Sequence, residues 1–248
     1  MMSLTEVSVI DSVKRQFKFK LRSYIGAFTT LVAVQLIALL FSSSGTGSMG
    51  SGSESYSINV SYYSSDLVIM FTMLWSFITA ILITTKSYRY EDFMFVTSRL
   101  TSGLANVVFL LISSVIGGLF SVLAGYVQKV YLLYLSDSMN LLNAAPSISE
   151  IVVGILGAIF YMILFSALGY FVGMLTQFHK LFIILVPAYF FGSLFMSAKN
   201  DEEGLITKLF NFFVEETSLL VFIGKVLLVA ATLFYGSYLL SKRLEVRK

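Results

Sequence analysis

The chain has 248 residues, of which 57% are hydrophobic and only 12% are charged, and its formal net charge is +3. A soluble domain carries about 25% charged residues, so this composition would leave large apolar patches on a water-facing surface. It excludes an ordinary soluble enzyme, a disordered regulator and a nucleic-acid binder. Cysteine is absent and His179 is the single histidine, which excludes disulfide frameworks, thiolate metal sites and paired-histidine zinc motifs. A polytopic membrane protein remains.

The N-terminal segment, residues 1–23, contains an amphipathic pattern. Val9, Val13 and Phe17 recur at helical spacing, and basic side chains line the opposite part of the helix. Such a helix can lie in the membrane interface with its basic face on anionic head groups. A basic flank that merely orients the first membrane span is equally compatible with this pattern.

Six later segments are apolar and long enough, or nearly so, to cross a bilayer as helices, which takes about 20 residues. They are residues 24–41, 67–85, 104–127, 151–175, 181–197 and 218–240. The alternation of a membrane β-strand is missing from them. We therefore predict an all-α fold in which residues 1–248 form one transmembrane domain.

The basic residues orient these spans, because Lys and Arg concentrate in cytoplasmic segments. Five precede the first span, three lie between the second and third, one between the fourth and fifth, and four follow the last. These 13 of the 17 basic residues lie on one side, so we expect both termini in the cytoplasm. A cleaved signal peptide is disfavoured, because its removal would place the basic C-terminal tail outside.

The first outer loop, Ser42–Ser65, has 15 Ser or Gly among its 24 residues and is expected to be a flexible extracellular segment. Gly45–Gly50 matches GxGxxG. A dinucleotide-binding fingerprint needs a strand before it and a helix after it, whereas here a membrane span precedes and Ser-rich sequence follows. We reject a nucleotide site on that ground.

The cytoplasmic segment 86–103 is the most informative part of the chain. It mixes aromatic residues with both charge signs, and a short helix would place Tyr88 with Asp92, and Glu91 with Phe95, on one face. Exposed aromatics beside Arg are typical of protein contact surfaces. A charged hairpin with tyrosines anchored in the interface is the simpler alternative.

Other residues within the spans are more typical of helix packing than of a functional site. Gly169 and Gly173 are four residues apart in the fourth span, the spacing that lets helices approach closely. We expect Pro187 to kink the fifth span. Trp75 lies near the middle of the second span, where it faces either a packed core or a cavity. The last outer loop, residues 198–217, is apolar enough to dip back onto the outer leaflet.

The charges also constrain the energy source. Asp, Glu and His are absent from all six predicted span interiors, and Lys225 is the sole charge within a span, where it can snorkel. Ion-coupled transport needs an ionisable group in the membrane, so an antiporter is disfavoured, and so are a voltage sensor and an intramembrane hydrolase. There is no Walker A motif. Active transport by this chain would therefore need energy from another polypeptide.

In its order of parts the chain resembles the permease subunit of ABC-2-type exporters, in particular small Gram-positive permeases that export phenol-soluble modulins or confer lantibiotic immunity. The family's loop after the second span carries an acidic residue, a short apolar helix and a Ser-Arg pair. Glu91, Phe93–Val96 and Ser98-Arg99 fit this order. A proline that usually precedes the Ser-Arg pair is missing, since Thr97 runs directly into Ser98.

The resemblance implies a coupling helix that docks on a separate ABC ATPase, which would bind ATP and Mg, while this chain binds no cofactor and is not an enzyme. The implied coupling residues are Tyr88, Arg89, Glu91, Asp92, Phe93, Phe95 and Arg99. The turn with His179 and Lys180 would be a second contact, and Trp75, Gly169, Gly173 and Pro187 would serve the path or the packing.

The resemblance further implies a dimer of permeases in a bacterial plasma membrane. The nearly uncharged spans suggest amphipathic peptides, lipids or hydrophobic drugs as substrates. A scaffold or sensor subunit without a translocation path, and a channel, are the competing interpretations.

Overall fold

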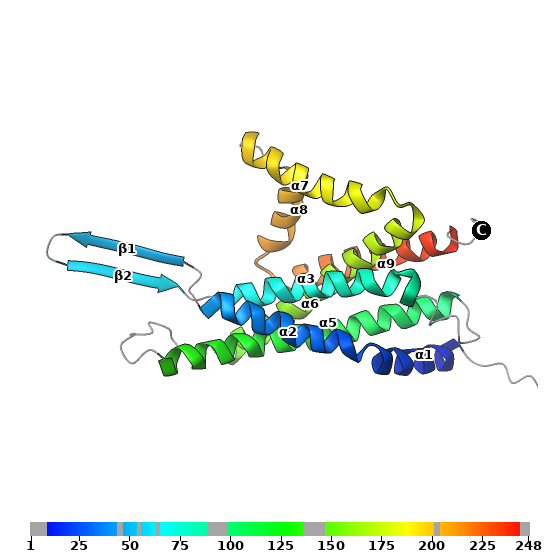
Figure 1. The fold of residues 1–248 in the computed structure, drawn as a ribbon, viewed down its shortest axis with the longest axis horizontal. Helices are drawn as coiled ribbons and strands as arrows, with labels where there is room; N and C mark the ends of the chain where they lie inside the picture. The colour runs from blue at the N-terminus through cyan, green and yellow to red at the C-terminus, as the bar shows by residue number, and fades with distance from the viewer. Residues whose placement is uncertain are drawn as a thin grey trace, which may run out of the picture.

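The computed structural model describes residues 9–43, 47–53, 56–62, 65–88, 99–135, 147–200 and 204–243. Figure 1 shows a bundle of long helices with a β-hairpin projecting from one end and two helices standing beside it. The elements are α1 (Val9–Ser23), α2 (Ile25–Ser43), β1 (Gly47–Ser53), β2 (Tyr56–Tyr62), α3 (Asp66–Thr84), α5 (Arg99–Leu135), α6 (Ile148–Phe178), α7 (Phe182–Asn200), α8 (Leu205–Val214) and α9 (Leu219–Arg243). The predicted helical fold is confirmed, with one hairpin added.

Five described helices are long and apolar enough to cross a membrane: α2, α3, α5, α6 and α9. Each corresponds to a predicted span, although α5 and α6 extend several residues beyond the predicted ends. The remaining predicted span, 181–197, coincides with α7, whose described apolar stretch is the shorter run Phe182–Ser193. The structure therefore supports a membrane protein with five candidate spans. The sixth span and the orientation of the termini stay predictions.

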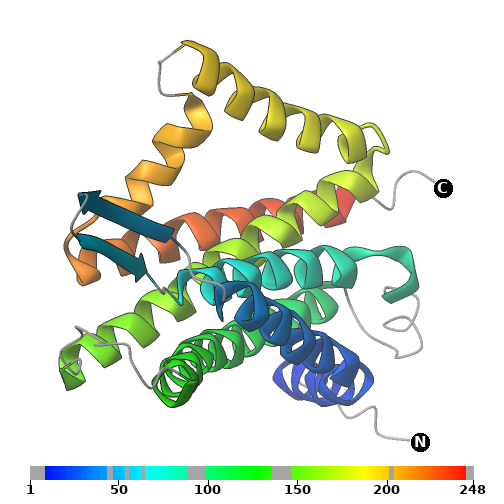
Figure 2. The same ribbon diagram turned by 60° about the vertical axis from the view of Figure 1, so that its left-hand side comes forward.

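Helix α6 is the centre of the bundle, with α3, α5 and α9 packed around it (Figures 1 and 2). The glycines of its small-residue pattern explain how closely α3 approaches. A Cβ atom added at Gly169 would clash with the carbonyl oxygen of Phe77, and one added at Gly173 would clash with the Thr84 hydroxyl. Only glycine at these positions lets the two backbones come this near. On α5, Gly118 makes a similar approach to Ile159 of α6.

The hairpin corrects the expectation that the first outer loop is simply flexible. Strands β1 and β2 pair antiparallel, from Gly47 opposite Tyr62 to Ser53 opposite Tyr56. The alternation of Tyr56, Ile58, Val60 and Tyr62 with small polar residues is typical of a strand, and the abundance of Ser and Gly in the loop obscured it. The hairpin also departs from a strictly all-α fold.

Helix α1 packs along the start of α5 and is followed by α2 after a break at Tyr24. In Figure 1 the beginning of α1 and the end of α9 lie at the same end of the bundle. The ends of α3 and α6 and the start of α5 lie there too. The predicted amphipathic helix is present, but it buries part of its surface on protein; its placement in a membrane interface stays a prediction.

Helices α7 and α8 stand apart from the bundle (Figure 2). Helix α7 touches α6 at their junction and α8 at its other end. Its apolar side chains, such as Ile184 and Phe195, are largely exposed. Helix α8 falls inside the predicted apolar loop 198–217 and returns the chain to the bundle, where Phe213 packs against α6 and α9.

The approach of α6 to α3 predicts a position-specific effect of small substitutions. Gly169→Ala forces the helices apart or strains them, and we expect a loss of about 1–3 kcal/mol of stability, the usual cost of overpacking. Gly154→Ala in the same helix is the matched control, because a Cβ there meets nothing within 4 Å.

Since Ala is the better helix former by about 1 kcal/mol, the Gly154 variant should be unchanged or more stable. Thermal unfolding of the purified full chain in detergent measures both. Equal melting temperatures for the two variants would contradict the close contact.

Candidate functional site

Basic side chains gather at the end of the bundle where the predicted coupling segment begins and ends, which we call the basic end. The described basic residues there are Lys14, Arg15, Lys18, Lys20, Arg22, Lys86, Lys180 and Lys242, together with Arg99, which begins α5, and Arg243, which ends α9. They come from α1, the segment after α3, the start of α5, the α6–α7 turn and the end of α9, which the fold brings to one end (Figure 1). The structure thus places together charges that are far apart in the sequence.

Two consecutive hydrogen bonds between buried polar side chains join three helices at this basic end. Lys20 of α1 is only 1% exposed, and its ammonium donates a hydrogen bond to Oδ1 of Asn106 on α5. The amide nitrogen of Asn106 in turn donates to the hydroxyl of Tyr170 on α6, at 3.4 Å. A buried ammonium needs such oxygen partners, because desolvation of an isolated charge is very costly.

One turn earlier on α1, Gln16 is 2% exposed. Neither its amide nitrogen nor its amide oxygen has a hydrogen-bond partner among the described residues. Sequence reasoning assigned α1 a basic outer face and missed that two of its polar side chains point inward. The Asn within the apolar run of α5 was the available sign, since a buried amide requires a polar partner.

Beside these hydrogen bonds, aromatic side chains link the same helices. The ring of Tyr24 packs edge-on against Tyr88, with ring centroids 4.8 Å apart, and against Phe109, at 5.5 Å. These residues belong to the largest apolar cluster of the bundle, together with Tyr170 and Met174. Tyr88, the first predicted coupling residue, is therefore half-buried and packed on Tyr24, which in turn contacts α5.

The other predicted coupling residues divide into two groups. Arg99 is the first residue of α5. Arg89, Glu91, Asp92, Phe93 and Phe95 lie outside the described residues. The structure thus fixes the two ends of the segment at the basic end and leaves the docking assignment itself untested.

The predicted second contact is an exposed turn. His179 ends α6 with an extended backbone, and its Nδ1 accepts a hydrogen bond from the Leu181 amide at 3.2 Å. Lys180 is exposed beside it. Both residues lie at the basic end, as α6 terminates there (Figure 1).

The remaining predicted residues lie within helices. Trp75 is 4% exposed, and its indole N–H donates to the Ala27 carbonyl and to the Thr30 hydroxyl, both at 3.1 Å. It packs over Gly117 of α5, so it occupies a packed core position. Gly169 and Gly173 form the α3–α6 contact described above. Helix α7 continues through Pro187, which is exposed.

The bundle interior contains neutral polar contacts instead of acids. Ser76 donates to the Met162 carbonyl, Gln128 to Ser42, and Gln35 to Thr72. Among the described residues, the acids of α3 and α6 are confined to their first turns, at Asp66 and Glu150. The part of the chain that the structure describes holds no cluster of side chains able to bind a metal.

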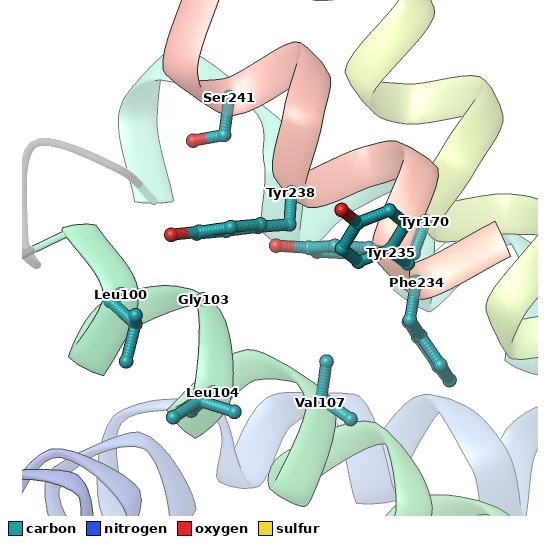
Figure 3. A pocket seen from close by; sticks show the side chains of 9 residues that line it. All are labelled: Leu100, Gly103, Leu104, Val107, Tyr170, Phe234, Tyr235, Tyr238 and Ser241. Carbon is teal, nitrogen blue, oxygen red and sulfur yellow. The ribbon is translucent and has the colours of Figure 1, made fainter. Parts of the chain in front are cut away.

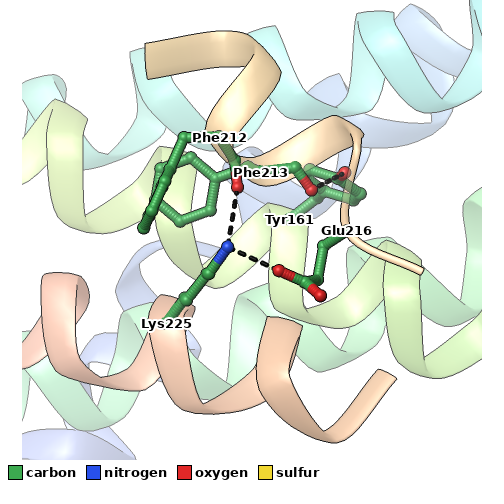
Figure 4. Close-up of polar contacts among 5 residues, drawn as sticks. All are labelled: Tyr161, Phe212, Phe213, Glu216 and Lys225. Atoms are coloured by element: carbon green, nitrogen blue, oxygen red, sulfur yellow. Dashed lines mark hydrogen bonds and ion pairs between the residues drawn. The ribbon is translucent and has the colours of Figure 1, made fainter. Parts of the chain in front are cut away.

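At the opposite end, a second cluster joins α8 to α9 (Figure 4). Lys225 forms an ion pair with Glu216 and donates to the Phe212 carbonyl at 3.2 Å. Its ammonium lies 3.9 Å from the centre of the Phe212 ring. Tyr161 of α6 donates to the Phe213 carbonyl at 3.3 Å. Lys225 thus reaches from α9 back to the segment after α8, as a snorkelling lysine does.

Comparison of the chain with protein-family models, with curated proteins and with solved structures finds no match.

The Lys225–Glu216 pair predicts a pH-dependent attachment of α8. The hydrogen bond from Lys225 is the largest influence on the carboxyl group and holds the pKa of Glu216 below its usual value, against an opposing effect of partial burial. A depressed pKa means that the contact stabilises the folded chain above the usual pKa, about 4.3. The stabilisation is lost as the pH falls through the lower folded-state pKa.

Because the chain has no cysteine, one cysteine introduced at the exposed Leu209 of α8 can carry an environment-sensitive fluorophore. Its emission should shift as the pH falls below the usual glutamate pKa and through the lower folded-state pKa of Glu216. Glu216→Gln should give the shifted emission already at neutral pH, whereas Glu215→Gln, which changes the exposed neighbour, should behave like the parent. A shift that is the same in all three chains would contradict the pairing.

Proposed function

We propose that this chain is the membrane-spanning permease subunit of an ATP-driven exporter of the ABC-2 type. It would act in the bacterial plasma membrane as a pair of permease chains with a separate ABC ATPase. The observation that supports the proposal is that Tyr88 and Arg99, the two ends of the predicted coupling segment, lie with the His179–Lys180 turn at one basic end of a helical bundle. A cytoplasmic ATPase would need both contacts on one face.

The side chains inside the bundle support the proposal that another protein supplies the energy for transport. Ion-coupled transporters use ionisable groups within the membrane. The described helices instead connect to each other through hydroxyl and amide groups, such as Ser114 with Ser166 at 3.4 Å. The buried ammonium of Lys20 lies at the basic end, where it ties α1 to α5. ATP bound by the partner would therefore supply the work of transport.

Coupling through Tyr88 follows from its contacts. Its ring packs against Tyr24, where α1 meets α2, and Tyr24 packs against Phe109 of α5. A force on the segment that begins at Tyr88 would reach two spans and α1 through side chains already in contact. Closure of the ATPase pair would then act on these helices and on α6, which shares their apolar cluster.

The apolar interior suits amphipathic peptides, lipids or hydrophobic drugs as substrates. The direct test measures ATP hydrolysis by the purified complex in lipid nanodiscs while an amphipathic helical peptide is added. Stimulation supports this substrate class, and a complex that responds to no such peptide argues against it.

Docking of the ATPase can be tested at its proposed anchors. Replacing both Phe93 and Phe95 with Asp places charges where apolar side chains would enter the groove of the ATPase. We expect recovery of the ATPase with the tagged full chain from its host membranes to fall by at least about tenfold, since buried aromatic anchors dominate interface energies. Mass spectrometry identifies and quantifies the ATPase.

The matched control is Tyr134→Asp, which removes an aromatic side chain that is 88% exposed at the far end of α5. It should leave ATPase recovery unchanged. Undiminished recovery with the double variant would overturn the docking assignment. If the wild-type chain retains no ABC ATPase at all, a scaffold, sensor or channel takes the place of the permease.

A further inference from the structure

A cavity of about 400 Å³ opens between α5 and α9 at the basic end (Figure 3). This volume lies in the range of about 300–1,000 Å³ that is typical of small-molecule sites. The residues that line it are Leu100, Gly103, Leu104 and Val107 of α5, Tyr170 of α6, and Phe234, Tyr235, Tyr238 and Ser241 of α9.

The lining changes in character from one wall to the other. Leu100, Leu104 and Val107 make the α5 wall apolar, whereas the wall from α9 and α6 carries the hydroxyls of Tyr235, Tyr238, Ser241 and Tyr170 beside the ring of Phe234. In Figure 3 the hydroxyls of Tyr235, Tyr238 and Ser241 point to the same side. From Phe234 to Ser241 a helix rises about 10 Å. The cavity thus has an apolar wall from α5 and a wall with hydroxyls from α9 and α6.

A cation lies beside the α9 wall, next to a residue that lines the cavity. The ammonium of Lys242 lies 4.7 Å from the centre of the Tyr238 ring, and the side chain of Lys242 is otherwise exposed. On the inner side, Tyr170 is held by the hydrogen bond from Asn106, so this wall is anchored to α5. An occupant with an apolar tail and an anionic head would match the order of apolar wall, hydroxyls and ammonium.

We propose that the α5–α9 cavity binds one acyl chain of an anionic phospholipid from the leaflet at the basic end. The tail lies along Leu104, Val107 and Phe234, and the phosphate lies at the tyrosine hydroxyls and Lys242. Anionic lipid heads attract juxtamembrane lysines, which favours this occupant over a neutral lipid. The proposal goes beyond the exporter function and does not depend on it, because binding requires neither ATPase nor transport.

Gly103 gives a sharp test, because it lines the cavity and a Cβ there would meet nothing within 4 Å. Gly103→Leu should fill the site without disturbing the bundle. The full chain is reconstituted in vesicles of phosphatidylcholine and phosphatidylglycerol that contain a trace of phosphatidylglycerol with a photoreactive group in its acyl chain. Mass spectrometry then quantifies labelling of the α5 and α9 segments relative to α2, whose exposed Leu36 and Leu40 report ordinary lipid contact.

In the parent chain, the α5 and α9 segments should label more strongly than α2. Gly103→Leu should lower that ratio by about tenfold, which corresponds to losing contact with about two methylene groups. Gly224→Leu, at a position of α9 that is equally open, should leave it unchanged. If the parent ratio is near one, or if Gly103→Leu does not lower it, the cavity binds no specific acyl chain and the proposal fails.

A second variant tests the proposed contact between Lys242 and the lipid head group. Lys242→Gln should reduce the preference for the phosphatidylglycerol probe over a phosphatidylcholine probe by about fivefold, the effect of one lysine near an anionic head group. Lys129→Gln is the control, since Lys129 makes a similar contact with the Tyr126 ring, at 5.6 Å, away from the cavity. An unaltered preference after Lys242→Gln would overturn the assignment of an anionic lipid.

Discussion

The backbone contact between α3 and α6 is the constraint on which the rest of the bundle depends. In lipid, helices gain little from hiding apolar surface, so close packing and hydrogen bonds decide which faces meet. Gly169 and Gly173 bring α6 against α3, and Ser76 adds a bond to the Met162 carbonyl across the same interface. The other faces of α6 are then left for α5 and α9.

This arrangement determines what the basic end can do. Since Tyr170 and Met174 of α6 belong to the same cluster as Tyr24 and Phe109, α1 and the start of α5 are fixed on the central helix. Tyr88 joins that cluster through Tyr24. A partner that moved the segment after Tyr88 would therefore act on a packed core and not on a loose loop, which is what the proposed coupling to an ATPase requires.

Much of this fold could be predicted from the sequence, because hydrophobic length and small-residue spacing are local properties. They predicted six spans, five of which coincide with described helices long and apolar enough to cross a membrane, and they predicted the packing glycines of α6. The helical periodicity of α1 could not predict that Lys20 is buried, since its burial depends on Asn106, which is 86 positions away in the sequence. The hairpin was not predicted, because the high Ser and Gly content of the loop indicated a flexible segment and hid the alternation of Tyr56, Ile58 and Val60. The docking role of Phe93 and Phe95 depends on a partner, so the chain alone does not determine it.

Helix α7 presents a different requirement. Its bundle contacts are with α6 at their junction, and α8 connects its far end to the bundle through Lys225 and Tyr161. A helix whose apolar side chains are this exposed cannot face water over its whole length, so lipid or another chain must cover it. In the proposed permease pair, α7 is an apolar surface that a second copy could cover without displacing any contact of the bundle. The Lys225–Glu216 pair would then hold α8, and with it the far end of α7, in position for that partner.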